Sequence, residues 1–187
     1  PADMESELKG VVSLLAANKW PFRLHATYNE SISRFLDVYE EVNREIPFEG
    51  LHWFFDHCET IDEKNLERVK ALGGGIAVQC RMAYQGEYFM DRYGKEAAEH
   101  TPPVRRMLEM GIPVGAGTDA TRVASYNPWV SLYWLTTGKT VGGARMYREE
   151  DCLSREEALR LYTQGSTGMG SGSRSLNGPG THSGAAG

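Results

Sequence analysis

The chain has 187 residues, of which 41% are hydrophobic and 24% charged, and its formal net charge is −5. This composition suits one globular domain with a sizeable core, and the mild acidity disfavours nucleic-acid binding, which needs a basic surface. No apolar run approaches the roughly 18 residues of a membrane span, and three widely spaced cysteines without a secretory signal predict a reducing, cytoplasmic location.

The first part of the chain alternates helical and strand patterns. Apolar residues at three- and four-residue spacing predict a helix over 3–18. The run KWPFRLH (19–25) predicts a short strand. A second apolar stripe predicts a helix over 29–46, and LHWFFDH (51–57) predicts the next strand.

The same alternation continues to the end of the ordered pattern. Thr60 and Glu63 have the spacing of a capping box, which predicts a third helix that ends at the glycines 73–75. IAVQC (76–80) predicts a third strand, and a long connection follows over 81–100.

A fourth unit completes the series. Prolines in the first turn predict a helix over 101–111, and IPVGAGTD (112–119) predicts the fourth strand. Ser154 and Glu157 form a second capping-box pattern, which predicts a last helix. Residues 166–187 are rich in Gly and Ser, so we expect a disordered tail in which His182 is inert.

The order of elements predicts a parallel α/β sheet preceded by a helix. The four strand–helix units cover residues 20–165, and their length is close to that of (β/α)8 barrels, in which eight units typically fill about 250 residues. The pattern fits either a small open sheet or half of a TIM-type barrel. A half-barrel would leave the 19–25 and 112–119 strands with open edges, which favours association with a second copy.

Ionisable side chains stand where the predicted strands end. His25 ends the first strand, Asp56 and His57 the second, Gln79 the third and Asp119 the fourth. The carboxyl ends of parallel strands meet at one edge, and imidazole and carboxylate groups suit zinc and similar divalent ions. This arrangement predicts a metal site with a water that the metal activates.

Each of these residues also has a structural interpretation. A lone histidine such as His25 is often a hydrogen-bond partner, Asp119 could cap a turn, and Asp56 could pair with a neighbouring cation. The recurrence at equivalent places in successive units favours the metal site. His52 lies an odd number of residues from His57 and is expected on the opposite strand face, and His100 is expected at the surface.

The motifs FRLHATYNES, DHCETI, VQC and GIPVGAGTDA resemble the second half of an amidohydrolase-superfamily barrel, over residues 1–165. The most similar branch is amidohydrolase family 3, the YtcJ-like metal-dependent hydrolases. The resemblance implies strands five to eight of the barrel, with His25 and His57 as ligands of a divalent metal, expected to be zinc. It also implies that Asp119 is a metal ligand and the catalytic proton carrier.

The resemblance assigns further residues and a reaction. It implies that Asp56 stands behind the ligands and orients one of them or a neighbouring cation, and that Gln79, Arg122 and Asn127 contact the substrate. The reaction would be hydrolysis of an amide-like C–N bond, not a peptide bond, in a small molecule. Aromatic residues over 81–100 and 120–150 suggest an apolar substrate, although such residues are more often packing.

Other interpretations stay open. The His-X-His pair that the family places on its first strand is absent, so we expect the chain to be a fragment whose partner is the missing first half of the barrel or a second copy. A catalytically inactive half-barrel with a structural or interaction role is the first alternative. A flavodoxin-like binding domain is disfavoured, because the glycines 73–75 precede a strand and no phosphate-cradling loop follows one.

Overall fold

The computed structural model describes residues 3–166, so all of the predicted tail except Ser166 lies outside the described residues. The described chain is a mixed α/β structure with a four-stranded sheet in the order β1-β2-β3-β4, and each adjacent pair is parallel. The four predicted strands are confirmed. They are β1 (Phe22–Ala26), β2 (Trp53–His57), β3 (Gly75–Gln79) and β4 (Val114–Gly117).

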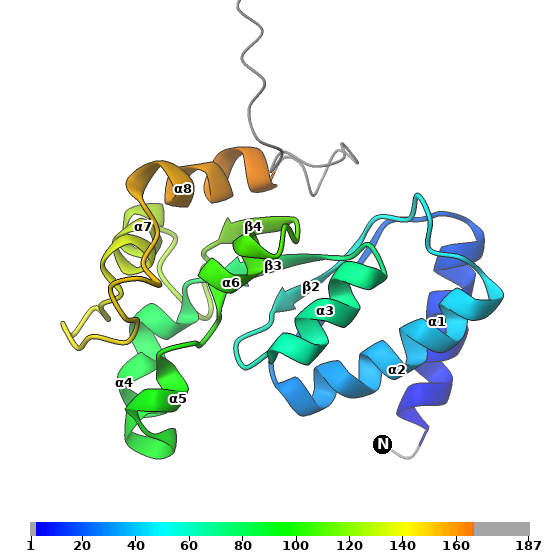
Figure 1. Ribbon diagram of the computed structural model, residues 1–187, viewed down its shortest axis with the longest axis horizontal. Helices are drawn as coiled ribbons and strands as arrows, with labels where there is room; N and C mark the ends of the chain where they lie inside the picture. Colours follow the sequence, from blue (N-terminus) through cyan, green and yellow to red (C-terminus); the bar gives the residue numbers. More distant parts are fainter. Residues whose placement is uncertain (1–2, 167–187) are drawn as a thin grey trace, which may run out of the picture.

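Helices connect and flank the strands. Figure 1 shows α1 to α3 grouped at one end of the sheet, with α4, α5, α7 and α8 at the other. None of the helices within residues 3–166 is both long enough and apolar enough to span a membrane. The helices are α1 (Met4–Ala17), α2 (Asn29–Glu45), α3 (Glu63–Ala71), α4 (Arg81–Tyr93), α5 (Lys95–Ala98), α6 (Val104–Glu109), α7 (Pro128–Thr137) and α8 (Arg155–Arg160), followed by the π-helical turn η1 (Leu161–Gly165).

The segment expected to be a long connection over 81–100 is mostly helical, so that expectation is wrong. Met82, Ala83 and Gly86 are the buried residues of α4 and recur at helical spacing. Gly86 lies so close to the next layer that an added Cβ would meet the sulfur of Met146 at 2.1 Å. Close packing of α4 against the segment that follows α7 therefore explains a glycine that resembled a loop signal.

The start of α3 differs from the predicted capping box. The N-cap is Asp62, whose side chain accepts a hydrogen bond from the Asn65 amide at 2.8 Å. The hydroxyl of Thr60 instead accepts from the backbone N–H of Asn29 at 2.9 Å, at the start of α2. The second predicted capping box is confirmed, because Ser154 and Glu157 exchange both hydrogen bonds.

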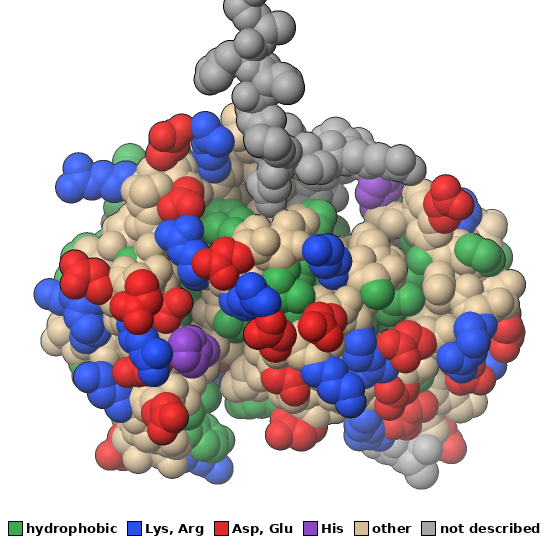
Figure 2. Space-filling view, in the orientation of Figure 1, with side chains coloured by type: hydrophobic (Ala, Val, Ile, Leu, Met, Phe, Trp, Pro, Cys, Tyr) green, Lys and Arg blue, Asp and Glu red, His purple; other side chains and the backbone are tan. Residues whose placement is uncertain are grey.

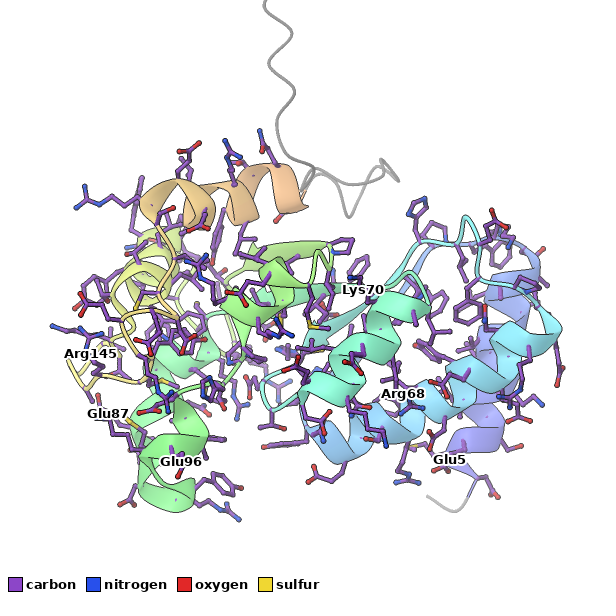
Figure 3. The ribbon with its side chains drawn as sticks, viewed as in Figure 1. Glu5, Arg68, Lys70, Glu87, Glu96 and Arg145 are labelled. Atoms are coloured by element: carbon purple, nitrogen blue, oxygen red, sulfur yellow. The ribbon has the colours of Figure 1, made fainter. Side chains whose placement is uncertain are left out.

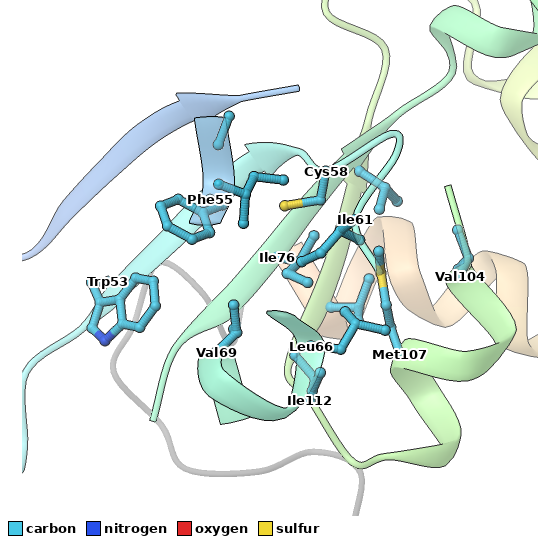
Figure 4. Packing of buried hydrophobic residues seen from close by; sticks show 14 of the residues in the cluster. Trp53, Phe55, Cys58, Ile61, Leu66, Val69, Ile76, Val104, Met107 and Ile112 are labelled. Carbon is cyan, nitrogen blue, oxygen red and sulfur yellow. The ribbon is translucent and has the colours of Figure 1, made fainter. Parts of the chain in front are cut away.

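Aromatic rings hold one face of the sheet against the helices. Tyr39 on α2 lies 5.0 Å from the ring of Trp53 and 5.4 Å from the ring of Phe55, measured between ring centroids. Figure 4 shows Phe55 and Ile76 on neighbouring strands, with Leu66 and residues of α6 packed beside them. Burial of these large rings contributes to the apolar driving force for folding.

Alternation along the strands gives the other face a different character. Arg23 and His25 are exposed, while Asp56 and Gln79 are buried. The register pairs His25 with Asp56, so the two residues face the same side of the sheet. The polar residues of the strands therefore share one face, opposite the aromatic core.

The charged surface is mixed in sign. Figure 2 shows acidic and basic side chains interspersed over the face in view. Arg68 on α3, labelled in Figure 3, illustrates the pattern. It reaches Asp37 and Glu40 of α2, each at 2.6 Å. Ion pairs exposed on both sides, such as Arg160 with Glu156, contribute about 0–1 kcal/mol each.

Candidate functional site

The structure brings His25 and His57 together at the carboxyl end of the sheet. Their ring centroids are 4.4 Å apart with an angle of 67° between the ring planes. Strand alternation would place His57 with Phe55 on the aromatic face. His57 instead has a φ of 75°, and the following Cys58 has a φ of 49°. This left-handed backbone turns the His57 ring toward His25.

Such a conformation is unfavourable for a residue with a side chain. A left-handed non-glycine residue costs on the order of 1–3 kcal/mol, and it persists only where surrounding structure enforces it. Here the amide of Cys58 donates to Ala26 on β1 at 2.9 Å, which ties the end of β2 to its neighbour. The strain therefore falls on the residue whose ring completes the pair.

Burial sets the protonation of His57. His57 is only 7% exposed, and its Nδ1 atom has no hydrogen-bond partner among residues 3–166. Burial lowers the pKa of His57, and the nearby His25 lowers it further, against the opposing charges of Asp119 and Asp56. The neutral imidazole that results is the form that ligates metals. His25 is exposed, and its Nε2 atom lies 3.1 Å from the Thr27 hydroxyl.

Asp56 is held by a cation rather than directed at a histidine. Arg23 contacts both carboxylate oxygens, with Nε donating to Oδ2 at 2.7 Å. The amide nitrogen of Gln79 lies 3.5 Å from Oδ1 of Asp56. These contacts form a chain across β1, β2 and β3 on the polar face, directly beside His25 in the sheet register.

Asp119 follows β4 and is exposed, with a φ of 56°. Its charge raises the pKa of His57 and also that of Glu59, so it lies within electrostatic reach of the pair. Within residues 3–166, however, no group of three or more His, Cys, Asp or Glu side chains is close enough to hold a metal ion. Two of the three predicted ligands are therefore adjacent, and the third is near but not part of a ligand cluster.

The predicted substrate residues are dispersed. Gln79 is buried on β3, where its Oε1 atom has no hydrogen-bond partner in the described chain. Arg122 and Asn127 are exposed on the segment between β4 and α7. The side-chain oxygen of Asn127 accepts from the Trp129 amide at 3.0 Å and caps α7. Asn127 thus has a structural task in addition to any contact with substrate.

Sequence reasoning missed one ion pair at this edge. Glu59 is 2% exposed, and its Oε2 atom accepts from Nη1 of Arg81 at 2.7 Å. Burial raises the pKa of Glu59, while Arg81 opposes that effect. The signal was present in the sequence, because both residues stand two positions beyond a strand end, Glu59 after His57 and Arg81 after Gln79.

Solved structures share this fold. A metal-dependent hydrolase from Pyrococcus furiosus superposes with a TM-score of 0.71 and 24% identity. A metal-dependent hydrolase from Pyrococcus horikoshii OT3 gives a TM-score of 0.74 and 21% identity. Each match covers 88% of this chain and 32% of the other chain. At these identities the likeness establishes the fold alone.

The sequence establishes the family. The model of the amidohydrolase family matches residues 2–174, and the chain belongs to that family. A Bacillus subtilis (strain 168) protein named "Putative amidohydrolase YtcJ" is 25% identical over 138 residues, which are 72% of this chain and 26% of that protein. The chain therefore spans about a quarter to a third of the length of these relatives.

Proposed function

We propose that residues 1–165 are strands five to eight of a metal-dependent hydrolase barrel that cleaves amide-like C–N bonds, other than peptide bonds, in a small molecule. Membership of the amidohydrolase family supports the hydrolase assignment. The observation that carries the proposal is the strained backbone of His57, which aims a neutral, partly unsatisfied imidazole at His25. Backbone strain of this kind clusters at functional sites.

The residues divide into four roles. His25 and His57 would hold a divalent ion, for which zinc suits imidazole ligands. A bound zinc supplies a water whose pKa is lowered toward neutrality. Asp119, within electrostatic reach of His57, would accept a proton at its carboxylate and return it to the leaving amine. Arg23 fixes Asp56, and Gln79, Arg122 and Asn127 would contact the substrate.

The fit to a metal is partial, and this favours a second possibility. The described residues supply two adjacent imidazoles but no cluster of three ligands. The chain also covers only 26–32% of the relatives that it matches. A half-barrel that is catalytically inactive by itself, with a structural or interaction role, accounts for the same observations.

Zinc titration followed by calorimetry tests the assignment. We expect weak zinc binding by the chain, and a loss of at least about tenfold in affinity for His25→Ala and for His57→Ala, because each change removes a ligand. His100→Ala is the matched control, since His100 is exposed and should leave the affinity unchanged. Equal affinities in all four proteins would refute the metal site.

Activity separates the two possibilities. A chromogenic N-acyl anilide and zinc are incubated with the chain, and release of the amine is measured. Zinc binding at His25 and His57 without hydrolysis supports the inactive half-barrel. Hydrolysis that Asp119→Asn abolishes, with zinc affinity retained, supports the catalytic role of the carboxylate.

A further inference from the structure

A second arginine stands at the edge of the sheet where His25 and His57 meet. Arg81 is the first residue of α4, two positions after β3 ends at Gln79. Its charge lowers the pKa of His57, so the guanidinium lies within electrostatic reach of that imidazole. Arg81 therefore borders the candidate site without being one of its proposed ligands.

Glu59 anchors one corner of the Arg81 guanidinium. Its Oε2 atom accepts from Nη1 of Arg81 at 2.7 Å. The side chain of Glu59 is 2% exposed, which makes it the most buried carboxylate of the ion pairs within residues 3–166. A buried anchor limits the rotation of a long side chain, so less conformational entropy is lost when a ligand binds to it.

The other edge of the guanidinium makes no hydrogen bond within residues 3–166. Nε and Nη2 of Arg81 donate to no acceptor there, and the side chain is 27% exposed. In Arg23 the same two nitrogens hold both carboxylate oxygens of Asp56. This planar edge matches a carboxylate through two parallel hydrogen bonds. Arg81 is therefore built to hold a second carboxylate while Glu59 holds the first.

The start of α4 contributes to the same electrostatic field. This helix has 13 residues, and its N-cap Cys80 makes no side-chain hydrogen bond. The first main-chain N–H groups of a helix lack carbonyl partners within it, and they favour an anion at that end. Because Arg81 is the first residue of α4, the two positive contributions add to one another at the carboxyl end of β3.

The balance of charge also favours an anionic ligand. The carboxylates at this edge are Asp56, Glu59 and Asp119, and the guanidinium groups are Arg23 and Arg81. The divalent ion of the proposed function would leave one positive charge in excess. One carboxylate on the substrate restores neutrality at a partly buried site, where an uncompensated charge is costly.

We propose that Arg81, anchored by Glu59, binds a carboxylate that the substrate carries close to its scissile C–N bond, and so makes the site specific for anionic amides. Nε and Nη2 each donate to one carboxylate oxygen, while Nη1 stays on Glu59. This inference rests on the proposed function, because the nearness of Arg81 to His57 is what places the carboxylate close to the amide.

Hippurate and hippuramide are suitable probes, because both contain the same benzamide group and they differ only in a carboxylate against a carboxamide. Their affinities for the chain are measured by NMR chemical-shift titration, with zinc and without it. In the presence of zinc we expect hippurate to bind at least about tenfold more tightly than hippuramide, since hydrogen bonds to a charged group are the stronger ones. Equal affinities under both conditions would overturn the proposal.

Substitutions assign the preference to Arg81. Arg81→Met/Glu59→Gln removes the guanidinium without leaving a buried carboxylate unpaired, so the ratio of the two affinities should fall to about one. Arg81→Lys keeps the charge but lacks the planar edge, and the ratio should fall several-fold. Arg148→Met is the matched control. Arg148 also donates through a single nitrogen to one carboxylate, at 2.6 Å to Glu99, and its loss should leave the ratio unchanged.

The zinc titration separates this inference from the proposed function. If zinc binds at His25 and His57 but the two probes bind equally, only the role of Arg81 is overturned. If zinc does not bind, the proposed function fails and the comparison without zinc decides: a preference for hippurate that the double variant abolishes supports Arg81. A preference that survives in the double variant, or unfolding of both Arg81 variants by circular dichroism, would overturn the proposal.

Discussion

At the scale of single residues, the pair of Arg23 and Asp56 decides how the polar face is stabilised. The side chain of Asp56 is 12% exposed, while that of Arg23 is 59% exposed, so the carboxylate bears most of the desolvation. The guanidinium also lies 5.2 Å from the ring of Phe54, measured to its centroid, which further orients it. A buried carboxylate that loses its partner is strongly destabilising. Replacing Arg23 alone should therefore cost more free energy of unfolding than the intact ion pair contributes.

Replacing Arg23 alone should therefore lower the free energy of unfolding more than replacing both Arg23 and Asp56. We expect Arg23→Met to lower the free energy of unfolding by about 1–3 kcal/mol, because it leaves the Asp56 carboxylate unsatisfied. Arg23→Met/Asp56→Leu should recover part of this loss. Urea denaturation of the single and double variants measures the coupling, and simple additivity of the two changes would contradict it.

The site shows what residue-level reasoning from sequence can and cannot reach. The strand ends of His25, His57 and Asp119 were predicted, because parallel strands finish at a common edge. The parity rule, which assigned strand faces by counting from His57, assumes regular backbone. The φ of 75° at His57 breaks that rule, and the sequence alone does not reveal which non-glycine residue adopts a left-handed conformation.

At the scale of elements, the cap of α3 distinguishes two sequence signals that lie side by side. Asp62 accepts from Asn65 in its own helix and also from the side chain of Asn29 at 2.9 Å, so it joins α2 to α3. Glu63, which the expected capping box required, instead pairs with Arg106 of α6. Contacts with other helices therefore decide the roles of Asp62 and Glu63, and the capping box of Thr60 and Glu63 does not form.

Substitution separates the two roles. Asp62→Ala should lower the free energy of unfolding by about 0.5–2 kcal/mol, because it removes the cap of α3. Glu63→Ala should change it by less than about 1 kcal/mol, since it removes an exposed ion pair. Thermal or urea denaturation compares the two variants. A larger effect at Glu63 than at Asp62 would support the capping box of Thr60 and Glu63 that the sequence predicted.

The cap of α8 gives stability a pH dependence. Hydrogen bonding to Arg105, assisted by Ser154, lowers the pKa of Glu157 from 4.5 to about 2. The unfolded chain binds this proton more readily, so the contribution of Glu157 is present above about pH 4.5 and is lost as pH falls toward 2. Glu157→Gln should therefore destabilise the protein above pH 4.5, and its difference from the unaltered chain should shrink on acidification.

A matched acid controls that experiment. Glu156 adjoins Glu157 but is 75% exposed at its side chain and pairs with Arg160 one turn away. Glu156→Gln should change the free energy of unfolding by less than about 1 kcal/mol at each pH, since it removes an exposed ion pair. The same slope in both variants would show that Glu157 gains nothing from Arg105.

Elements with strong local signals were predicted well, and those defined by tertiary contacts were not. The strands and α2 follow from apolar periodicity alone. Helix α4 was missed because Gly86 and its aromatic neighbours resemble a loop, although residues 82, 83, 86 and 90 have helical spacing. Helix α7 was also missed, although Asn127 as N-cap and Pro128 in its first turn give it a readable start.

At the scale of the whole molecule, the sheet has one aromatic face, one polar face, a covered edge and an open edge. The central strands β2 and β3 are paired on both sides. Strand β4 is protected by η1 and Ser166, whereas β1 has no strand beyond it within residues 3–166. Local stability should follow this order, because amide protection depends on how much structure must open to expose a hydrogen bond.

Amide hydrogen exchange followed by NMR tests this order residue by residue. Within β1, the amides of Leu24 and Ala26 should exchange slowly because they face β2, and those of Arg23 and His25 should exchange rapidly because they face solvent. Alternation of this kind along one strand cannot arise from general flexibility, which would speed exchange at all four positions. The comparison is internal to the strand, so it needs no variant. Slow exchange at Arg23 and His25 in the unaltered chain would show that the β1 edge is already paired, and would contradict an open edge.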